Sequence, residues 1–241
     1  MTEAELIDRL VAAQRQMASD VDSQPFAALD RAAAYRVQTG VLAALGQTAG
    51  MLKTAIHADG VGVVAPIYAS NVGTAPGYRL SSRGAIGLEV EVGVVLARDI
   101  ASNPSVDIAA VSAAIDRYFL GVEICGTRYP DRKAAGPMGG LADNMSGLGY
   151  CIGPTRPNDA IDGLEVRLEF AGKPIYAAPS KHAFGTVLAS LVAYARAQHP
   201  KYPLKAGTII TTGSMCGLVA TSGPGHVVAG LGGETLEFDL V

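Results

Sequence analysis

The chain has 241 residues, of which 49% are hydrophobic and only 17% are charged, with a formal net charge of −3. This composition provides for one large core and leads us to expect that part of the surface is buried in a homo-oligomer. The absence of a Lys/Arg cluster argues against a nucleic-acid partner, and no apolar run reaches the roughly 18 residues of a membrane helix.

The start of the chain and its cysteines both predict a cytoplasmic protein. Residues 1–7 are acidic and amphipathic, unlike the positively charged start of a secretory signal. Cys125, Cys151 and Cys216 are widely spaced in apolar surroundings. We interpret them as reduced core thiols, and not as a disulfide framework or a zinc site.

The N-terminal part has helical periodicity. Apolar stripes over residues 3–19 and about 28–45 predict two helices. Beyond residue 46 the chain becomes rich in Gly and Val, with strand-like runs. We therefore expect a helical segment at 1–46 that packs on a β-rich domain at 47–241.

The β-rich part contains fewer helical signals. Strands and helices do not alternate regularly, so the fold class we predict is α+β, with a core that is predominantly a mixed β-sheet. The expected elements, in chain order, are a helix at about 105–117, a loop at 127–146, a hairpin of 164–170 with 173–177, a helix at about 182–197 and short strands over 208–241.

Carboxylates interrupt two of the apolar runs that we expect to be strands. Glu89 and Glu91 lie in the run 86–96, and Glu123 lies in the run 118–125. Because side chains alternate along a strand, Glu89 and Glu91 share one face, about 7 Å apart, where they are costly unless solvated or neutralised. A divalent cation would neutralise both, with Glu123 as a third oxygen ligand. The lack of a well-placed His or Cys favours Mg²⁺ or Mn²⁺ over Zn²⁺.

A second interpretation of the same carboxylates needs no metal. The Glu face of the first strand could point to water, and Glu123 could pair with an Arg. Apolar residues flank Glu123 on both sides, and unpaired buried carboxylates are rare, which favours the metal. The pattern alone leaves both interpretations open.

Lys53 is a lone cation among the small and apolar residues of 50–57. A buried lysine needs an anion beside it, such as a metal-bound carboxylate substrate, whereas a surface strand lysine needs none. His57 could reach the same site or be an ordinary polar residue at a strand end. For the scattered remaining histidines we expect surface or helix-cap roles: His182, His199 and His226.

With these residues, the sequence resembles those of the fumarylacetoacetate hydrolase superfamily. Within it, the sequence is most similar to the branch of 2-oxopent-4-enoate hydratase and 4-oxalocrotonate decarboxylase. The resemblance covers nearly the whole chain and rests on the order and spacing of several segments. They are Ala34-Tyr35-Arg36-Val37-Gln38; Glu89-Val90-Glu91 with Arg98-Asp99; Val122-Glu123-Ile124 with Thr127-Arg128 and Asp131; Ala142-Asp143-Asn144-Met145-Ser146; Leu204 to Ile210 with Thr212-Gly213-Ser214; and Gly232-Gly233.

The resemblance implies a roll of mixed β-sheets that forms the catalytic domain. It also implies a role for each matching residue. The metal ligands would be Glu89, Glu91 and Glu123, and the active-site lysine would be Lys53. The general acid or base would be Asp143, from a matching segment, or His57, which is a feature of this chain and not of the family pattern. The residues near the substrate would be Ser146, Gly213 and Ser214.

The implied activity is that of a hydratase with Mg²⁺ or Mn²⁺, acting on a small anionic 2-oxo acid in aromatic compound catabolism. It would add water to a 2-hydroxypenta-2,4-dienoate-type acid through a metal-stabilised enolate. A 4-oxalocrotonate-type decarboxylase is the alternative, because the same electron sink serves both reactions. An acylpyruvate C–C hydrolase and a non-catalytic 2-oxo-acid-binding paralogue, in complex with a related pathway enzyme, are further alternatives.

The chain departs from the family pattern at three places. Gly147 follows Ser146 where relatives have a second serine, Cys216 replaces a threonine, and Thr54-Ala55-Ile56-His57 replaces the usual segment after Lys53. These positions face the substrate and spare the three carboxylates. The metal and the class of chemistry therefore follow more directly from the resemblance than the substrate does.

Overall fold

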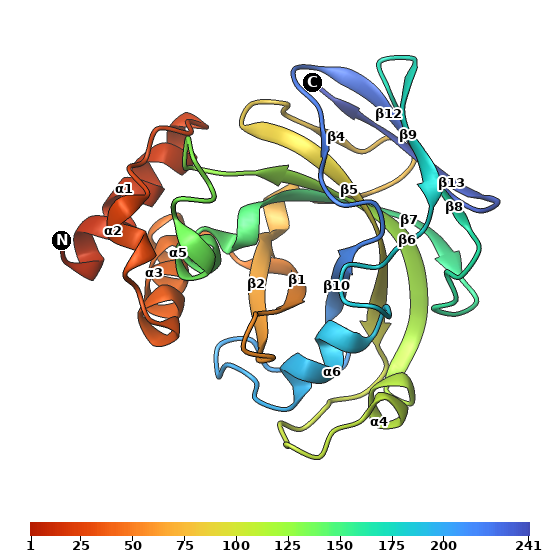
Figure 1. The fold of residues 1–241 in the computed structure, drawn as a ribbon, viewed down its shortest axis with the longest axis horizontal. Helices are drawn as coiled ribbons and strands as arrows, with labels where there is room; N and C mark the ends of the chain where they lie inside the picture. Colours follow the sequence, from red (N-terminus) through yellow and green to blue (C-terminus); the bar gives the residue numbers. More distant parts are fainter.

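The computed structural model describes residues 1–241 and shows two curled β-sheets with the N-terminal helices packed at one end (Figure 1). None of its helices has the length and apolar character that a bilayer crossing requires. The helices are α1 (Glu3–Gln16), α2 (Gln24–Ala27), α3 (Arg31–Ala44), α4 (Ile108–Ser112), α5 (Gly136–Ala142) and α6 (Ala189–Ala195), with the 3-10 helices η1 (Ala69–Asn71) and η2 (Asn144–Ser146).

The larger sheet has eight strands in the order β2-β1-β10-β5-β6-β7-β3, and β11 pairs with β5 beside β10. The β1–β10 and β3–β7 pairs are parallel, and the other pairs are antiparallel. Its strands are β1 (Ala49–Ile56), β2 (Gly62–Tyr68), β3 (Val72–Thr74), β5 (Ala85–Leu96), β6 (Ile115–Gly126), β7 (Gly147–Arg156), β10 (Ile209–Ser214) and β11 (Val219–Ala220).

The smaller sheet has five strands in the order β4-β13-β12-β8-β9 and lies to the right of the larger one in Figure 1. It contains the predicted hairpin, which turns at Ala171-Gly172 as expected. Both sheets are curled and one of the pairs in this sheet is parallel, so the predicted α+β fold with a mixed β-sheet roll is confirmed. Its strands are β4 (Arg79–Leu80), β8 (Glu165–Phe170), β9 (Lys173–Pro179), β12 (Gly225–Leu231) and β13 (Glu234–Leu240).

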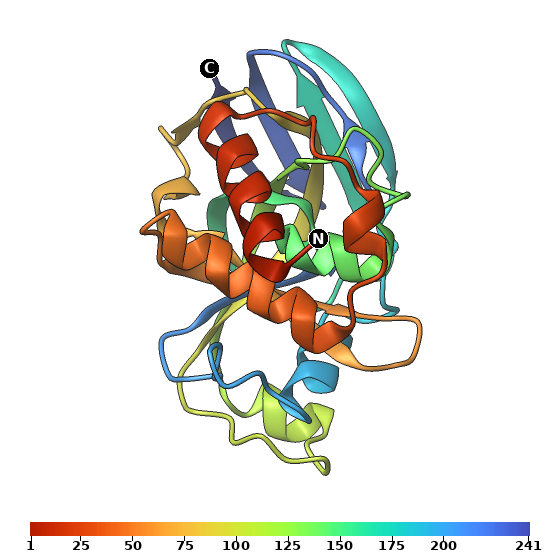
Figure 2. The same cartoon turned by 90° about the vertical axis from the view of Figure 1, so that its left-hand side faces the viewer.

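The N-terminal helices lie side by side against one end of the larger sheet (Figure 2). Thr2 caps α1, and Asp30 caps α3 by accepting a hydrogen bond from the Ala33 amide at 2.7 Å. In the core, Gln38 donates to the Leu141 carbonyl at 2.8 Å, and the Tyr35 hydroxyl accepts from the Val64 amide at 3.0 Å. The helices and the sheet share one hydrophobic cluster, and the division at residue 46 remains a prediction.

The two later helices are shorter than the periodicity predicted. The helix expected at about 105–117 covers only α4, because β6 begins at Ile115 and buries its apolar residues in the sheet. The helix expected at 182–197 covers only α6. The residues before it form turns that pair with β10, where the Ala183 amide donates to the Ser214 carbonyl at 2.8 Å. The predicted loop 127–146 contains α5 and η2.

Large hydrophobic side chains are rare on the surface, where only Met1, Ile108 and Val241 are strongly exposed. These three are far apart in the sequence and do not by themselves mark an interface. The homo-oligomer therefore stays a prediction.

Contact between α6 and β2 depends on Gly62. A Cβ added at Gly62 would lie 2.2 Å from the Tyr194 amide nitrogen and 2.3 Å from the Ala193 carbonyl carbon. Backbone atoms within a helix cannot shift one at a time. The clash in Gly62→Ala must therefore move α6 as a whole away from β2. Gly140, within α5, has nothing within 4 Å of the same position.

We predict that Gly62→Ala lowers the free energy of unfolding by about 1–3 kcal/mol, as overpacking does. The control Gly140→Ala should leave it unchanged or raise it, because alanine favours a helix. Urea unfolding measures both. An unchanged stability in Gly62→Ala would show that α6 does not pack on β2 in this way.

Candidate metal centre

The carboxylates of β5 and β6 line one face of the larger sheet. Glu89 lies directly opposite Glu123, and Glu91 lies opposite Gly121. Opposed residues of an antiparallel pair share a face, so all three acids lie on the face that Leu88, Val90 and Val92 do not occupy. This face is inside the protein: Glu123 is 0% exposed and Glu91 is 2% exposed. The alternative in which the Glu face of β5 points to water is therefore wrong for Glu91, whereas Glu89 is partly exposed.

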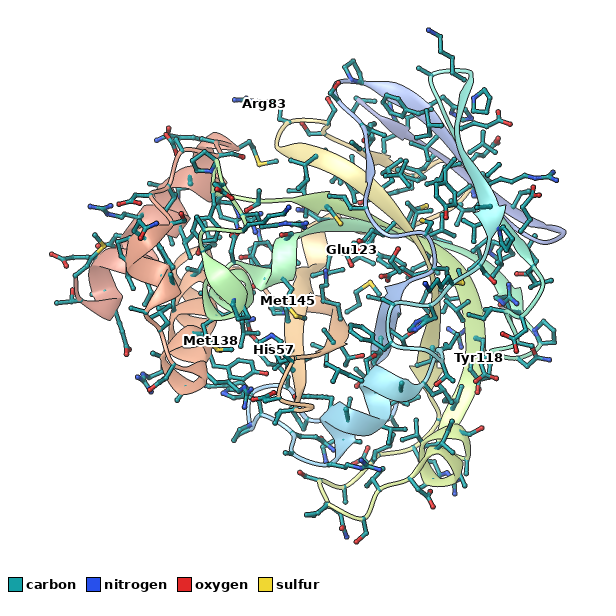
Figure 3. The ribbon with its side chains drawn as sticks, viewed as in Figure 1. His57, Arg83, Tyr118, Glu123, Met138 and Met145 are labelled. Carbon is teal, nitrogen blue, oxygen red and sulfur yellow. The ribbon has the colours of Figure 1, made fainter.

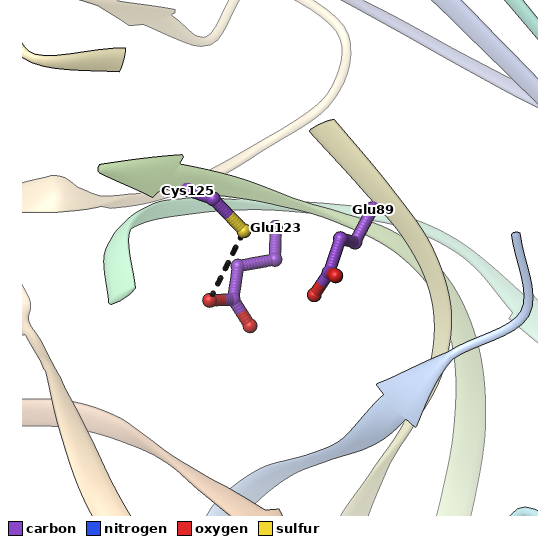
Figure 4. A group of neighbouring side chains, drawn as sticks. All are labelled: Glu89, Glu123 and Cys125. Carbon is purple, nitrogen blue, oxygen red and sulfur yellow. Dashed lines mark hydrogen bonds between the residues drawn. The ribbon is translucent and has the colours of Figure 1, made fainter. Parts of the chain in front are cut away.

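A thiol joins two of these carboxylates. One donor atom each from Glu89, Glu123 and Cys125 lies within 4.8 Å of the others (Figure 4). The Cys125 thiol donates to Glu123 Oε1 at a Sγ–O distance of 3.7 Å. Glu91 lies outside this group of three, and its carboxylate accepts a hydrogen bond from Thr211 Oγ1. Sequence reasoning had placed no cysteine near the carboxylates, and the structure corrects that expectation.

Lys53 supplies the positive charge of the site. It extends from β1, is only 9% exposed, and forms an ion pair with Glu123 Oε1. Its ammonium also donates to the Met145 carbonyl at 2.9 Å. The alternative of a surface lysine is therefore wrong, and Glu123 pairs with this lysine instead of an arginine.

A left-handed turn presents the Met145 carbonyl to Lys53. Asn144, Met145 and Ser146 have φ values of 51°, 50° and 64°, a region that residues other than glycine rarely adopt. In Figure 3, Met145 lies beside Glu123 within the curl of the larger sheet. Three such residues in succession cost energy that the surrounding packing must offset, which is typical of functional positions.

A buried ion pair holds the segment that carries this turn. Asp143 pairs with Arg128 and accepts from the Arg128 amide and from Thr127 Oγ1, both at 3.0 Å. A cavity lies beside Lys53, and Asp143 is not among the residues that line it. Both carboxylate oxygens of Asp143 already accept hydrogen bonds, from Arg128 and Thr127. The structure therefore gives it a clear positioning contact and no free oxygen for proton transfer.

The single ammonium of Lys53 lies near three carboxylates, and this excess of negative charge shifts the pKa values of the site. Burial alone would lower the pKa of Lys53, but Glu123 and its acidic neighbours outweigh burial and raise it. Burial raises the pKa of Glu123 to about 6, against the effect of Lys53 and with the help of Glu89. Burial, Glu123 and Glu89 raise the pKa of Glu91 well above its usual range. Burial and the same carboxylates also raise the pKa of Cys125.

A cavity of about 200 Å³ opens beside these residues. Its lining combines the charged side chains Lys53, Glu89 and Glu91 with four hydrophobic residues. A larger cavity of about 450 Å³ elsewhere has Glu237 as its one ionisable side chain and offers no comparable chemistry. The residues that line the smaller cavity are Lys53, Thr54, Ala55, Glu89, Glu91, Met145, Ala183, Phe184, Gly213 and Ser214.

Two of the predicted substrate residues line this cavity, and two other predicted residues do not. Gly213, with φ 125°, and Ser214 border it. The Ser214 hydroxyl is used within its own turn, because it donates to the Gly217 carbonyl at 3.2 Å. Ser146 belongs to the left-handed turn and is buried outside the lining, and His57 also lies outside the lining, with its Nδ1 buried and unpartnered. In the view of Figure 3, Met145 lies between Glu123 and His57.

Other positions differ from the sequence expectations. His182 is buried, not on the surface, and burial lowers its pKa to about 4. Gly147 packs closest to the turn before it, because a Cβ there would lie 3.1 Å from the Asn144 carbonyl oxygen and only in ordinary contact, 3.4 Å, with the Lys53 Cδ. Cys216 accepts from the Val90 amide at 3.4 Å and is outside the cavity lining.

Sequence reasoning also missed the hydroxyl groups behind Glu91. Thr211 Oγ1 bonds to Glu91 and lies 3.1 Å from the Tyr150 hydroxyl. These residues come from β10 and β7, and only the register of the sheet brings them together. Cys125 was within reach of sequence reasoning, because it is two residues from Glu123 on the same strand and so shares its face.

The side chains present fit a divalent cation. Three carboxylates and one ammonium leave excess negative charge on an inner face of the sheet. Glu123 Oε2 has no hydrogen-bond partner although the residue is fully buried. A cation bound there would satisfy this oxygen and neutralise the excess charge.

The chain is similar in fold to several solved structures. Two are structures of 4-oxalocrotonate decarboxylase from Pseudomonas putida G7, one complexed with calcium and acetate and one with magnesium and adipate. Each superposes with a TM-score of 0.83 at 20% identity, over 100% of this chain and 99% of the other. The 2-hydroxyhepta-2,4-diene-1,7-dioate isomerase from Mycobacterium marinum superposes less closely, with a TM-score of 0.55 at 18% identity over 79% of this chain and 73% of that chain.

The sequence also matches a family model. The model describes the fumarylacetoacetate (FAA) hydrolase C-terminal domain, and the match extends over residues 53–238. It thus includes Lys53, the three carboxylates and the Gly213-Ser214 turn, and it spans most of the chain. The chain therefore belongs to the fumarylacetoacetate hydrolase family.

Proposed function

We propose that this protein is a metal-dependent hydratase that acts on a 2-hydroxypenta-2,4-dienoate-type 2-oxo acid. The observation that carries the proposal is the cavity that joins an acidic, lysine-containing end to apolar walls. Glu89, Glu91 and Glu123 would hold Mg²⁺ or Mn²⁺. When bound, such a cation supplies a Lewis acid that binds the carboxylate and keto oxygens and stabilises negative charge on the keto oxygen.

Lys53 has the properties of an anion-binding group. Its raised pKa keeps the ammonium charged, so it serves as a hydrogen-bond donor and not as a base. In the structure it is bonded to Glu123 Oε1 and to the Met145 carbonyl, which aim it at the acidic end of the cavity. There it would bind the substrate carboxylate and offset the charge of the three glutamates.

The apolar walls favour a substrate with one charged end. Ala55, Ala183 and Phe184 face the cavity, and Lys53 is the one cation in its lining. The vinyl end of a 2-hydroxypentadienoate would fit such walls. Loss of the 2-hydroxyl proton and protonation at C5 would give a 2-oxo-3-enoate with no net change in protons. Addition of water across C3 and C4, with H to C3 and OH to C4, would then yield a 4-hydroxy-2-oxo acid.

Decarboxylation of a 4-oxalocrotonate-type acid is the second candidate. Its support is the structural similarity to 4-oxalocrotonate decarboxylase over the full length of both chains. That substrate has a second carboxylate, for which the cavity lining offers no second cation. The same enzyme framework would then release CO₂ in place of adding water.

The first prediction concerns turnover. We expect 2-hydroxypenta-2,4-dienoate to lose its ultraviolet absorbance with Mg²⁺ or Mn²⁺, to retain it with EDTA, and to release no CO₂. Glu91→Gln should lose turnover and bind Mg²⁺ at least about tenfold more weakly. The exposed Glu237 provides a matched control, because Glu237→Gln changes the same charge away from the site. Metal-dependent activity that survives in Glu91→Gln would refute the ligand assignment, and CO₂ release would indicate the decarboxylase.

The second prediction separates the lysine from the metal. Lys53→Met keeps the length of the side chain but removes a charge-assisted hydrogen bond worth about 1.5–3 kcal/mol, so oxalate should bind roughly 10–100-fold more weakly. Mg²⁺ should bind at least as tightly, because the ammonium no longer competes for Glu123. Calorimetry measures both, with the exposed pair Lys205–Asp99 providing Lys205→Met as control. Unchanged oxalate affinity in Lys53→Met would contradict the role of Lys53.

The third prediction follows from the pKa of Glu123, about 6 in the folded protein against 4.5 for the free side chain. The folded state keeps the Glu123 carboxyl protonated to a higher pH than the unfolded state does. The contribution of Glu123 to stability is therefore present at low pH and lost as the pH rises through 6. Without metal, wild type should therefore lose stability relative to Glu123→Gln as the pH rises from 4.5 to 7. Mg²⁺ needs the ionised form, so its stabilising effect should grow over the same range. Urea unfolding at each pH, with and without Mg²⁺, tests both signs; a Mg²⁺ effect that is largest at low pH would contradict them.

A further inference from the structure

Cys125 lies beside Glu89 and Glu123, outside the lining of the cavity, and the proposed reaction does not use it. Its Sγ lies in the group with donor atoms of Glu89 and Glu123, all within 4.8 Å of one another. Donor atoms around one ion lie at most about two metal–ligand bond lengths apart, or roughly 4–5 Å. The thiol is therefore as well placed for a shared ion as the two carboxylates are.

The surroundings of the thiol leave it free for such a role. Cys125 is buried and is not part of a disulfide. Its one hydrogen bond is the long contact of 3.7 Å to Glu123 Oε1. Glu123 Oε2 is also buried and has no partner at all. Figure 4 shows the thiol and both carboxylates directed toward one another. A metal ion would give partners to the two weakly satisfied groups at once.

We propose that Cys125 is a metal ligand and that the site therefore prefers a borderline dication such as Co²⁺ or Zn²⁺ to Mg²⁺. The proposal rests on the metal centre of the proposed function and names the class of metal that it takes. Carboxylate oxygens alone suit hard ions, whereas a thiolate adds a soft donor and shifts affinity toward the later transition metals. On binding, the Sγ–H bond is replaced by a bond from Sγ to the metal, and the proton leaves to solvent without oxidation of either partner.

Co²⁺ is the probe for this proposal, because a thiolate ligand gives it a near-ultraviolet charge-transfer band that oxygen ligands do not give. We expect this band in the wild-type protein and its loss in Cys125→Ser. The variant should bind Co²⁺ roughly 10–100-fold more weakly. Loss of a residue that only orients a metal ligand already lowers metal affinity by this factor, and loss of a ligand should lower it at least as much. Its affinity for Mg²⁺ should stay the same, because Mg²⁺ gains little from sulfur.

Cys216→Ser is the matched control, since Cys216 is the other thiol near Glu89 and Glu91, and it should keep the band. If the wild-type protein binds Co²⁺ but shows no charge-transfer band, the proposal is wrong. This test uses the wild-type protein alone and so does not depend on the folding of a variant. A band that persists in Cys125→Ser would also overturn it, and Cys125→Ala repeats the test without a hydroxyl.

Turnover of the dienoate separates this proposal from the proposed function. Metal-dependent turnover in a protein that lacks the band would leave the hydratase standing and remove Cys125 from the ligands. The band without turnover on any of the metals would support the thiol ligand and remove the hydratase. Failure to bind either Co²⁺ or Mg²⁺ would overturn both.

Discussion

The burial of negative charge inside the curl of the larger sheet is the constraint on which the site depends. Two of the glutamates on adjoining strands are almost fully enclosed, and one ammonium is available to them. A carboxylate removed from water is costly unless it is paired. The raised pKa values of Glu91 and Glu123 show that Lys53 does not fully compensate them. The proposed cation would complete the compensation, and the proposed chemistry uses the same cation.

The rest of the fold positions the side chains and the carbonyl group that contact these carboxylates or Lys53. The parallel pairing of β1 with β10 brings Lys53 beside Thr211, whose hydroxyl bonds to Glu91. The Arg128–Asp143 pair anchors the segment that enters the left-handed turn, and the turn gives Lys53 a carbonyl partner. These supports come from segments far apart in the chain. They keep a flexible lysine in one place, which lowers the cost of binding an anion there.

The sequence predicted those parts of the site that follow from local periodicity. Alternation along a strand placed Glu89 with Glu91, and both line one cavity with Lys53, whose active-site role stays a prediction from the family resemblance. The same alternation would have placed Cys125 beside Glu123, but its apolar neighbours suggested a core thiol. The contacts of Thr211, Tyr150 and Phe184 depend on the register between strands and on loop packing, which no local pattern encodes. The helix at 105–117 failed for a related reason, because burial in β6 outweighed helical periodicity.

The measurement that tests the account most directly is a calorimetric titration of the wild-type protein with Mg²⁺, followed by oxalate, an analogue of the chelating end of a 2-oxo acid. We expect one Mg²⁺ site per chain and oxalate binding that requires the metal. Loss of both in Glu123→Gln would locate them at the buried carboxylates. Oxalate that binds equally well in EDTA, or a protein that binds no Mg²⁺, would contradict a metal-dependent 2-oxo acid site.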